Sequence, residues 1–243
     1  LCPGETALLT VACDNRVNHS TLPVGNEEGQ LAFFGSDNAG IPSVEAAKRI
    51  AAPQNRPNFD FFNYAGIHRP VWLYTTQKEY IEDVTVVPAV DGTVQYAVKT
   101  TGSAPAHVTV LDADGKAVAS AEGAEGTITI PEVHLWEPRP GTPYLYTLHI
   151  TCGADVYDQT FGVRSIEVRG TQVLLNGKPL YFKGFCKHED FTAHGRGFDP
   201  VLNVKDVNLI HWANANAVRT SHYPYAEEFY DLCDREGILV MDE

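Results

Sequence analysis

The sequence predicts a multidomain chain of β plus α/β class, in which β structure gives way to parallel α/β structure near residue 164. Between residues 77 and 163, apolar and polar residues alternate with the period of two that half-buried strands require. After Arg164, short apolar strands alternate with segments of helical period, which is the order of a parallel sheet. A length of 243 residues allows one large domain or two small ones.

Residues 1–76 are expected to form β structure that is too short for a complete domain. Ala7–Cys13 and Pro70–Tyr74 are strand-like apolar runs. Pro, Gly, Asn and Ser gather in Leu22–Pro57, which predicts long loops in which only Val44–Ile50 approaches a helical period. Because two or three strands do not make a stable domain, we expect this domain to lack its beginning.

Seven strand candidates follow in residues 77–163, separated by turn signals at Asp91-Gly92, Asp112–Gly115 and Cys152-Gly153. Seven short strands in so short a segment predict a β-sandwich of the immunoglobulin-like type, with Trp136 and Tyr146 in its core. We expect no catalytic role for this domain. The candidates are Ile81–Val87, Thr93–Thr100, His107–Leu111, Ala117–Ala121, Thr127–Ile130, Tyr144–Thr151 and Val156–Val163.

The remaining segment, 164–243, is expected to alternate strand and helix. A hairpin across Asn176-Gly177, the residue pair of a type I′ turn, leads into the strand Pro179–Phe185. Ala217–Thr220 and Ile238–Met241 are the next two strands. This order is the opening of a (β/α)8 TIM barrel, which takes about 250 residues when complete, so we expect the domain to lack its end.

Two helices are expected to connect these strands. Asp199 is the N-cap of the first helix and Pro200 its first residue. The second helix starts at Pro224 and stops at Gly237. The apolar residues that recur at helical spacing are Val201, Val204, Val207, Ile210 and Trp212 in the first helix and Phe229, Leu232 and Cys233 in the second.

The formal net charge of −13 excludes nucleic acid as a partner, because no basic face exists to displace counterions from phosphates. An anionic substrate would need a local cationic clamp. No apolar run approaches the roughly 18–20 residues needed to cross a membrane. The five cysteines are odd in number and widely spaced without a CxxC pair, so we expect free thiols and a cytoplasmic location.

Chemistry-bearing side chains gather after two predicted strands, in Tyr181–Asp190 (YFKGFCKHED) and Arg219–Tyr225 (RTSHYPY). The carboxyl ends of barrel strands are where such enzymes place their chemistry. From position alone, His188 either joins a structural hydrogen-bonded cluster or contacts substrate. Arg219 either pairs with a neighbouring carboxylate or orients a catalytic carboxylate and keeps its pKa low.

Other chemistries fit these segments less well. Cys186, His188, Glu189, Asp190 and His194 lack the paired spacing of zinc ligands, so no metal is expected. Ser221-His222 is not a hydrolase pair, because adjacent residues rarely have the required geometry and no GxSxG elbow is present.

Asp60 stands among aromatic residues, between Phe59 and Phe61. Such a carboxylate can accept two sugar hydroxyls while aromatic rings cover the apolar face of the sugar. An aspartate at a sheet edge beside core aromatics explains the same pattern equally well, and composition alone leaves both interpretations open.

Long blocks of the sequence resemble glycoside hydrolase family 2, in the branch that acts on β-D-glucuronides rather than on β-galactosides. The resemblance covers essentially the whole chain. Cys186-Lys187 departs from it, since Gly-Arg is expected before the His-Glu pair, and lysine keeps the cation without the planar fork. The blocks are Phe59–Thr76, Leu175–Asp190, Gly195–Leu202, Arg219–Glu243 and the sandwich segment HLWEPRPGTPYLYTL.

This resemblance implies a partial sugar-binding jelly roll in residues 1–76, an immunoglobulin-like sandwich in 77–163 and the first part of a catalytic TIM barrel in 164–243. It implies retaining hydrolysis of β-D-glucuronides by two glutamates, which are expected beyond Glu243, so the chain alone should be inactive. No cofactor is expected. The expected partners are a small glucuronide substrate and further copies of the full-length protein in a homo-oligomer.

The resemblance also implies roles for four residues. Asp60 binds sugar hydroxyls from the jelly roll, and His188 binds the sugar beside it. Arg219 supports the catalytic nucleophile, and His222 is a further pocket residue. Hydrolysis of β-galactosides or another exo-glycosidase activity is the alternative within the family, and a non-catalytic carbohydrate-binding β protein is the alternative outside it.

Overall fold

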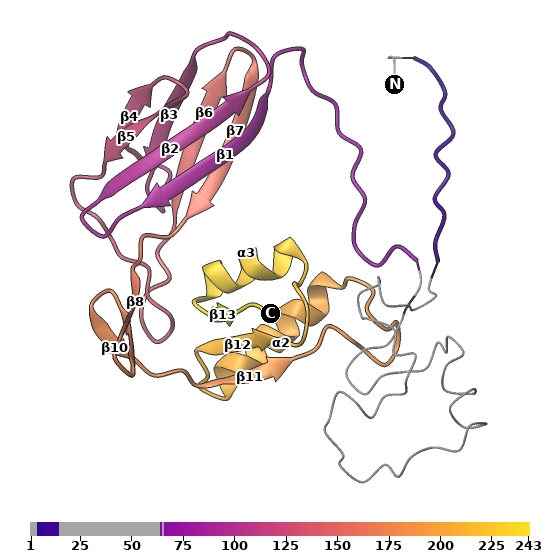
Figure 1. Ribbon diagram of the computed structural model, residues 1–243, viewed down its shortest axis with the longest axis vertical. Coiled ribbons are helices and arrows are strands. Elements are labelled where there is room, and N and C mark those ends of the chain that lie inside the picture. The colour runs from indigo at the N-terminus through magenta and orange to yellow at the C-terminus, as the bar shows by residue number, and fades with distance from the viewer. Residues whose placement is uncertain (1–3, 15–63, 65) are drawn as a thin grey trace, which may run out of the picture. The chain divides into compact units, whose positions relative to one another are not determined.

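The computed structural model describes residues 4–14, 64 and 66–243 (Figure 1). They belong to two compact units. One comprises Leu1–Pro70 with Glu189–Phe198, and the other comprises Val71–His188 with Asp199–Glu243. Asp60, Leu22–Pro57 and Val44–Ile50 lie outside the described residues.

Seven antiparallel strands form two facing sheets, which confirms the predicted sandwich, and each candidate segment overlaps one strand. One sheet has the order β1-β2-β5 and the other the order β4-β3-β6-β7 (Figure 1). The strands are β1 (Ile81–Pro88), β2 (Thr93–Thr100), β3 (Ala106–Leu111), β4 (Ala117–Glu122), β5 (Glu125–Thr129), β6 (Tyr146–Cys152) and β7 (Asp155–Phe161).

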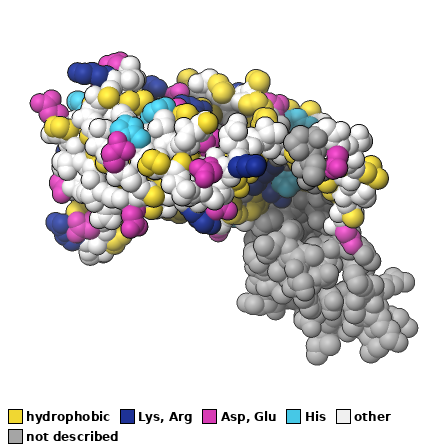
Figure 2. Space-filling view, turned by 90° about the horizontal axis from the view of Figure 1, so that it is seen from above, with side chains coloured by type: hydrophobic (Ala, Val, Ile, Leu, Met, Phe, Trp, Pro, Cys, Tyr) yellow, Lys and Arg dark blue, Asp and Glu magenta, His cyan; other side chains and the backbone are white. Residues whose placement is uncertain are grey.

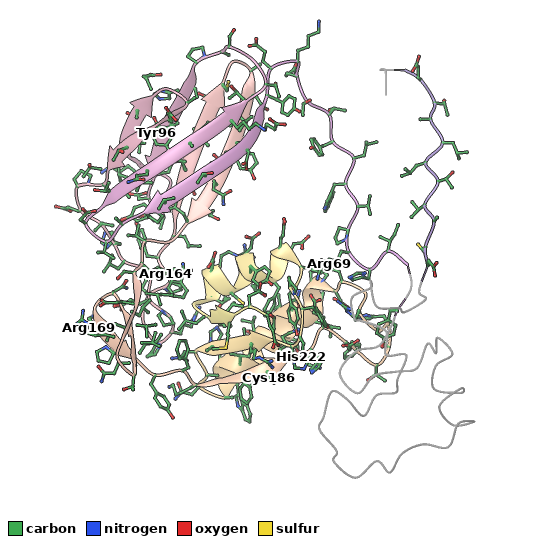
Figure 3. All side chains as sticks on the ribbon, viewed as in Figure 1. Arg69, Tyr96, Arg164, Arg169, Cys186 and His222 are labelled. Carbon is green, nitrogen blue, oxygen red and sulfur yellow. The ribbon has the colours of Figure 1, made fainter. Side chains whose placement is uncertain are left out.

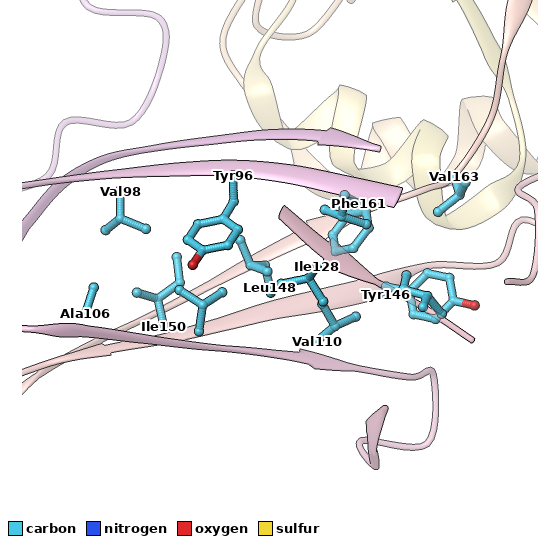
Figure 4. Packing of buried hydrophobic residues seen from close by; sticks show 13 residues of the cluster. Tyr96, Val98, Ala106, Val110, Ile128, Tyr146, Leu148, Ile150, Phe161 and Val163 are labelled. Carbon is cyan, nitrogen blue, oxygen red and sulfur yellow. The ribbon is translucent and has the colours of Figure 1, made fainter. Parts of the chain in front are cut away.

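The sandwich core forms because alternate residues of each strand point between the two sheets. In β6, Tyr146, Leu148 and Ile150 are buried, while the residues between them are only partly so. Tyr146 stacks on Phe161 with ring centroids 5.7 Å apart (Figure 4). The prediction that Tyr146 fills this core is therefore confirmed.

The prediction for Trp136 is wrong, because this side chain is buried outside the sandwich core. It packs with Ala217 and Leu239 of the α/β segment. Its indole Nε1 donates to the Asp234 carbonyl at 2.8 Å. Trp136 belongs to the connection between β5 and β6, and a sequence pattern cannot say which neighbour such a connection contacts.

A small antiparallel sheet follows, with the order β10-β9-β8. Asn176 and Gly177 have φ values of 51° and 75°, as a type I′ turn requires, which confirms the hairpin. The predicted single strand Pro179–Phe185 is wrong, because β10 ends at Leu180. Asn216 bonds the intervening backbone through its side chain, accepting from Lys183 N at 2.8 Å. The strands are β8 (Ile166–Arg169), β9 (Gln172–Leu175) and β10 (Lys178–Leu180).

The last three strands are parallel, with the order β11-β12-β13, and two helices connect them (Figure 1). The predicted strand at Ala217–Thr220 is confirmed, and the third strand begins one residue later than predicted. The elements are β11 (Gly184–Lys187), α2 (Pro200–Trp212), β12 (Ala217–Thr220), α3 (Glu227–Glu236) and β13 (Leu239–Met241).

The two helices differ in how well the sequence predicts them. Asp199 caps α2, accepting from Val201 N at 2.9 Å, and Pro200 is its first residue, as predicted. Helix α3 begins three residues after Pro224, because Ala226 is extended with ψ 143°. It ends as predicted at Gly237, whose φ is 73°.

The expected inward residues are also only partly confirmed. Val207, Ile210, Phe229 and Cys233 are buried and Leu232 is partly buried. Val201, Val204 and Trp212 are instead exposed.

In the described parts of residues 1–76, Ala7–Cys13 and Pro70–Tyr74 contain no strand, contrary to the prediction. A strand requires a neighbouring chain for its backbone hydrogen bonds, and neither run pairs with another strand among the described residues. The predicted free thiols are confirmed for Cys13, Cys152, Cys186 and Cys233, while Cys2 is outside the described residues.

Acidic, basic and hydrophobic side chains intermingle on the visible face of the described part (Figure 2). Within the described ranges, neither helix has the length and apolar character that crossing a membrane requires.

Candidate functional site

The parallel register brings the polar residues of three strand ends to one edge of the sheet. Cys186 of β11 pairs with Arg219 of β12, which pairs with Met241 of β13. His188 follows β11 directly, His222 lies two residues beyond β12, and Glu243 lies two residues beyond β13. The backbone therefore brings the two predicted segments, YFKGFCKHED and RTSHYPY, to the same edge of the sheet.

The two predicted histidines meet at this edge. The rings of His188 and His222 lie edge to face, with centroids 5.6 Å apart and an interplanar angle of 84°. His222, labelled in Figure 3, has its Nδ1 2.9 Å from Glu243 Oε2. Two imidazoles and a carboxylate thus gather where three strands end.

Arg219 is linked to the same carboxylate. Its guanidinium forms an ion pair with Glu243, and its Nη1 lies 3.7 Å from Cys186 Sγ. The hydrogen bonds to Cys186 and Glu243 raise the pKa of Arg219, so it stays cationic. The hydrogen bonds from His222 and Arg219 lower the pKa of Glu243, so it stays ionised at neutral pH.

Glu243 is a site residue that sequence reasoning missed, although it bridges two residues that were predicted. Asp242 beside it accepts from Thr220 Oγ1 at 2.9 Å and from the Tyr230 hydroxyl at 2.6 Å. The backbone N–H of Glu243 donates to Thr220 Oγ1 at 3.0 Å, which fixes the acidic pair against β12. The rule used for the other two strands would have found Glu243 as well. Polar residues that follow a parallel barrel strand lie on the side of the sheet that carries the active site.

A mostly apolar cavity of about 260 Å³ lies on the β11-β12-β13 sheet and reaches this cluster. Arg219 is the one charged side chain among its lining residues. Its other lining residues include Phe182, Phe185, Cys186, Ala217 and Met241. The site therefore combines apolar surface with a cation at the strand ends, as small-molecule sites commonly do.

Asp60, the fourth predicted site residue, lies outside the described residues. Near it in sequence, Arg69 Nη2 is 3.5 Å from Glu189 Oε2, and His68 O accepts from Phe198 N at 2.8 Å. Burial, with the charge of Arg196 second, lowers the pKa of His68. These contacts bind His68 and Arg69 (labelled in Figure 3) to the loop that follows β11, and both segments belong to the same compact unit.

Among the residues that the structure describes, no three His, Cys, Asp or Glu side chains are placed to hold a metal ion.

The seven-stranded sandwich is followed by a parallel α/β segment with charged strand ends, and both parts match models of one protein family. The family model described as glycosyl hydrolases family 2 matches residues 75–164, and the model of that family's TIM barrel domain matches residues 166–243. The chain belongs to glycosyl hydrolase family 2.

Two relatives that the chain matches over nearly its whole length are β-glucuronidases. The β-glucuronidase of Sus scrofa is 42% identical over 99% of this chain and 38% of its own length. That of Paenibacillus borealis is 41% identical over 99% of this chain and 40% of its own length. The chain thus spans well under half the length of these curated relatives.

Solved structures agree with these matches. The Faecalibacterium prausnitzii β-glucuronidase is 96% identical, with a TM-score of 0.86, over 95% of this chain and 39% of that one. The Ruminococcus gnavus β-glucuronidase in complex with uronic isofagomine is 45% identical, with a TM-score of 0.72, over 76% of this chain and 32% of that one.

Proposed function

We propose that the protein containing this chain hydrolyses β-D-glucuronides with retention of configuration. The observation that carries the proposal is the 96% identity to the Faecalibacterium prausnitzii β-glucuronidase over 95% of this chain. The uronic ligand of the Ruminococcus gnavus relative agrees with a glucuronide as substrate class. The cluster of imidazoles, guanidinium and carboxylate at the strand ends is the part of the pocket that this chain supplies.

The proposed domains are residues 1–76 as part of a sugar-binding jelly roll, 77–163 as the immunoglobulin-like sandwich and 164–243 as the first part of the TIM barrel. The two family matches, which meet between residues 164 and 166, support the second boundary. The strand–helix order of β11, α2, β12, α3 and β13 supports the barrel.

The proposed roles rest on the family resemblance, and the geometry at the sheet edge supports those of His188, Arg219 and His222. His188 and His222 bind sugar hydroxyls, since their rings are held together at the mouth of the strands. Arg219 supports the nucleophilic glutamate, because a guanidinium stabilises a nearby carboxylate in its charged form. Asp60 is proposed to bind sugar hydroxyls from the first domain.

The catalytic glutamates themselves are proposed to lie outside the 243 residues. Retaining hydrolysis needs two carboxyl groups about 5–5.5 Å apart that are free to exchange protons and attack the sugar. Glu243 is held by His222 and Arg219, and Asp242 by Thr220 and Tyr230. The family resemblance expects the acid/base glutamate in an Asn-Glu pair, and residues 164–243 contain no such pair, so the chain alone is expected to be inactive.

A panel of aryl glycosides tests the proposed function. The full-length protein should hydrolyse the β-D-glucuronide in preference to the β-D-galactoside and β-D-glucoside, and the 243-residue chain should show no turnover above buffer. Preference for the galactoside would replace the proposal with the alternative activity in the family. Turnover by the chain alone would contradict the placement of the glutamates.

The partners and location are proposed on the same basis. We expect the full-length protein to form a homo-oligomer, which sedimentation of the purified protein would show. A cytoplasmic location agrees with the free thiols of Cys13, Cys152, Cys186 and Cys233.

A further inference from the structure

Lys187, the last residue of β11, carries a charge in a largely enclosed place. Its side chain is only 10% exposed, and its Nζ is 3.1 Å from Asp206 Oδ2 on α2. The same Nζ lies 5.1 Å from the ring centroids of both Tyr225 and Phe229. A charge removed from water is costly unless it is paired, and here one carboxylate and two aromatic faces surround the ammonium.

Lys187 is also bonded to both segments that carry the pocket histidines. Its Nζ donates to the carbonyl of His188 at 3.2 Å. Its own carbonyl accepts from Ser221 N at 2.9 Å and from the Tyr225 hydroxyl. One residue therefore bonds the backbone of His188 and the residue that precedes His222.

The two histidines need such a connection because they lie beyond the strands that align their neighbours. The parallel ladder ends at the pairing of Lys187 with Thr220. His188 and His222 follow this last pair, yet their rings lie edge to face with centroids 5.6 Å apart. A shift of either segment by about 1 Å is enough to lower the rate of an enzyme by a large factor.

We infer that Lys187 is a positioning residue that fixes His188 and His222 relative to each other. The ammonium of Lys187 is anchored to α2 by Asp206 and to the start of α3 by the rings of Tyr225 and Phe229. The same ammonium bonds the His188 carbonyl, and the backbone carbonyl of Lys187 bonds Ser221 N, next to His222. The effect of Lys187 on glucuronide turnover rests on the proposed function, whereas its effect on the placement of the His188 and His222 rings does not.

Two substitutions separate the charge of Lys187 from its packing. Lys187→Met keeps an apolar stem against Tyr225 and Phe229 but leaves Asp206 without its cation and the His188 carbonyl without this donor. Lys187→Arg keeps the charge and adds donors in a planar fork. Lys205→Met is the matched control, because Lys205 is exposed on α2 next to Asp206.

The positions of the rings can be followed directly by NMR of the chain labelled with ¹³C at histidine Cε1, with signals assigned by replacing each histidine in turn. Lys187→Met should move the His188 and His222 signals and leave the histidines of the sandwich in place, while Lys187→Arg and Lys205→Met should keep all signals near their original positions. In the full-length protein, Lys187→Met should lower kcat/KM for a glucuronide by at least about tenfold, and Lys187→Arg should restore most of it.

Each outcome decides the inference. A folded Lys187→Met variant with unmoved His188 and His222 signals would overturn it. If Lys187→Met does not fold, Asp206→Asn is tested instead, because it removes the ion pair and retains Lys187. The His188 and His222 signals should then move, and unmoved signals would contradict the inference. If the signals move but the full-length wild-type protein hydrolyses no glucuronide, the proposed function fails and the positioning role stands.

Discussion

At the residue scale, Glu243 joins two side chains of the strand-β12 segment that would otherwise point independently into the site. Its carboxylate accepts from His222 Nδ1 and pairs with the guanidinium of Arg219. An ionised glutamate here holds the imidazole in one orientation and keeps the guanidinium at the edge of the cavity. Its importance lies in geometry, since an ion pair this exposed contributes little to stability.

Glu243→Gln should therefore damage activity more than stability. We expect kcat/KM of the full-length protein for a glucuronide to fall by about tenfold to hundredfold, because Arg219 loses its counter-ion and shifts. Glu228→Gln, on the exposed first turn of α3, is the control and should leave kcat/KM unchanged. An unchanged kcat/KM in Glu243→Gln would show that the carboxylate does not orient the pocket.

The pH dependence of this contact has a definite sign. Because the pKa of Glu243 is lower in the folded protein than its ordinary value of 4.5, its contribution to stability is present above that value and fades as the pH falls through the lowered pKa. The wild type should thus have a higher Tm than Glu243→Gln at pH 7, and the difference should shrink below pH about 4.5. A difference that grows on acidification would contradict the sign.

Cys233 is a second residue whose environment predicts a measurable chemistry. Burial raises the pKa of its thiol to about 12, so almost no thiolate is present at neutral pH. We expect iodoacetamide to modify the exposed Cys13 and Cys186 in the native chain, and Cys233 only after denaturation, as peptide mass spectrometry would show. Equal labelling rates for Cys233 and Cys186 would mean that the core around α3 opens readily.

At the element scale, the two helices begin in different ways. Asp199 satisfies backbone N–H groups at the start of α2, accepting from Val201 N and Leu202 N. Ala226 provides no side-chain cap for α3, which has Glu227 and Glu228 in its first turn instead. Carboxylates in that turn interact favourably with the helix dipole. Since α2 follows the loop that begins with His188 after β11, its start helps to fix the site.

Asp199→Ala should lower the free energy of unfolding by about 0.5–2 kcal/mol through loss of the N-cap. Urea denaturation followed by circular dichroism measures this difference. Asp231→Ala, an exposed substitution within α3, is the matched control and should be nearly neutral. Equal midpoints for the two variants would show that the cap contributes nothing.

The same elements show what the sequence could and could not predict. Strands with strict alternation, such as Thr93–Thr100, and helix ends with specific chemistry, such as Asp199-Pro200 and Gly237, were predicted because their causes are local. The break of Pro179–Phe185 into two strands was not, because Asn216, far along the chain, bonds the backbone between them. Neighbours distant in sequence decide such cases.

Some residues of the candidate site could likewise be predicted from the sequence and others could not. His188, Arg219 and His222 were found because each follows or lies in a predicted strand of the barrel order. Glu243 was missed although it obeys the same rule, and its role became visible only from its two partners. For Asp60 the contact with the barrel remains a prediction, since that residue lies outside the described part of the chain.

At the scale of the whole molecule, the connection between β5 and β6 joins the sandwich to the α/β segment. Trp136 Nε1 donates to the Asp234 carbonyl at 2.8 Å, and Arg139 Nε donates to the Glu236 carbonyl at 3.1 Å. Arg164 lies over the Trp136 indole, with its guanidinium carbon 5.2 Å from the ring centroid. The first two contacts reach the end of α3, and Arg164 covers the indole that makes one of them, so the β5–β6 connection supports the helix that packs behind β12 and β13.

Trp136→Ala should therefore weaken the coupling between the two parts as well as the stability of each. Truncation of a buried tryptophan lowers the free energy of unfolding by about 3–5 kcal/mol. At this position it also removes a contact between the sandwich and the α/β segment. Calorimetry should show one unfolding transition in the wild type and two in Trp136→Ala, with the α/β segment melting first because its short parallel sheet has less core of its own.

Two further variants locate the cause. Trp136→Phe keeps an aromatic ring but leaves the Asp234 carbonyl without its donor, which should cost about 1–3 kcal/mol while the single transition is retained. Trp212→Ala removes a side chain that is 86% exposed on α2 and should change neither the number of transitions nor the midpoint by much. If Trp136→Ala still unfolds in one transition, the two parts are coupled through other contacts, and the indole is only one member of a larger interface.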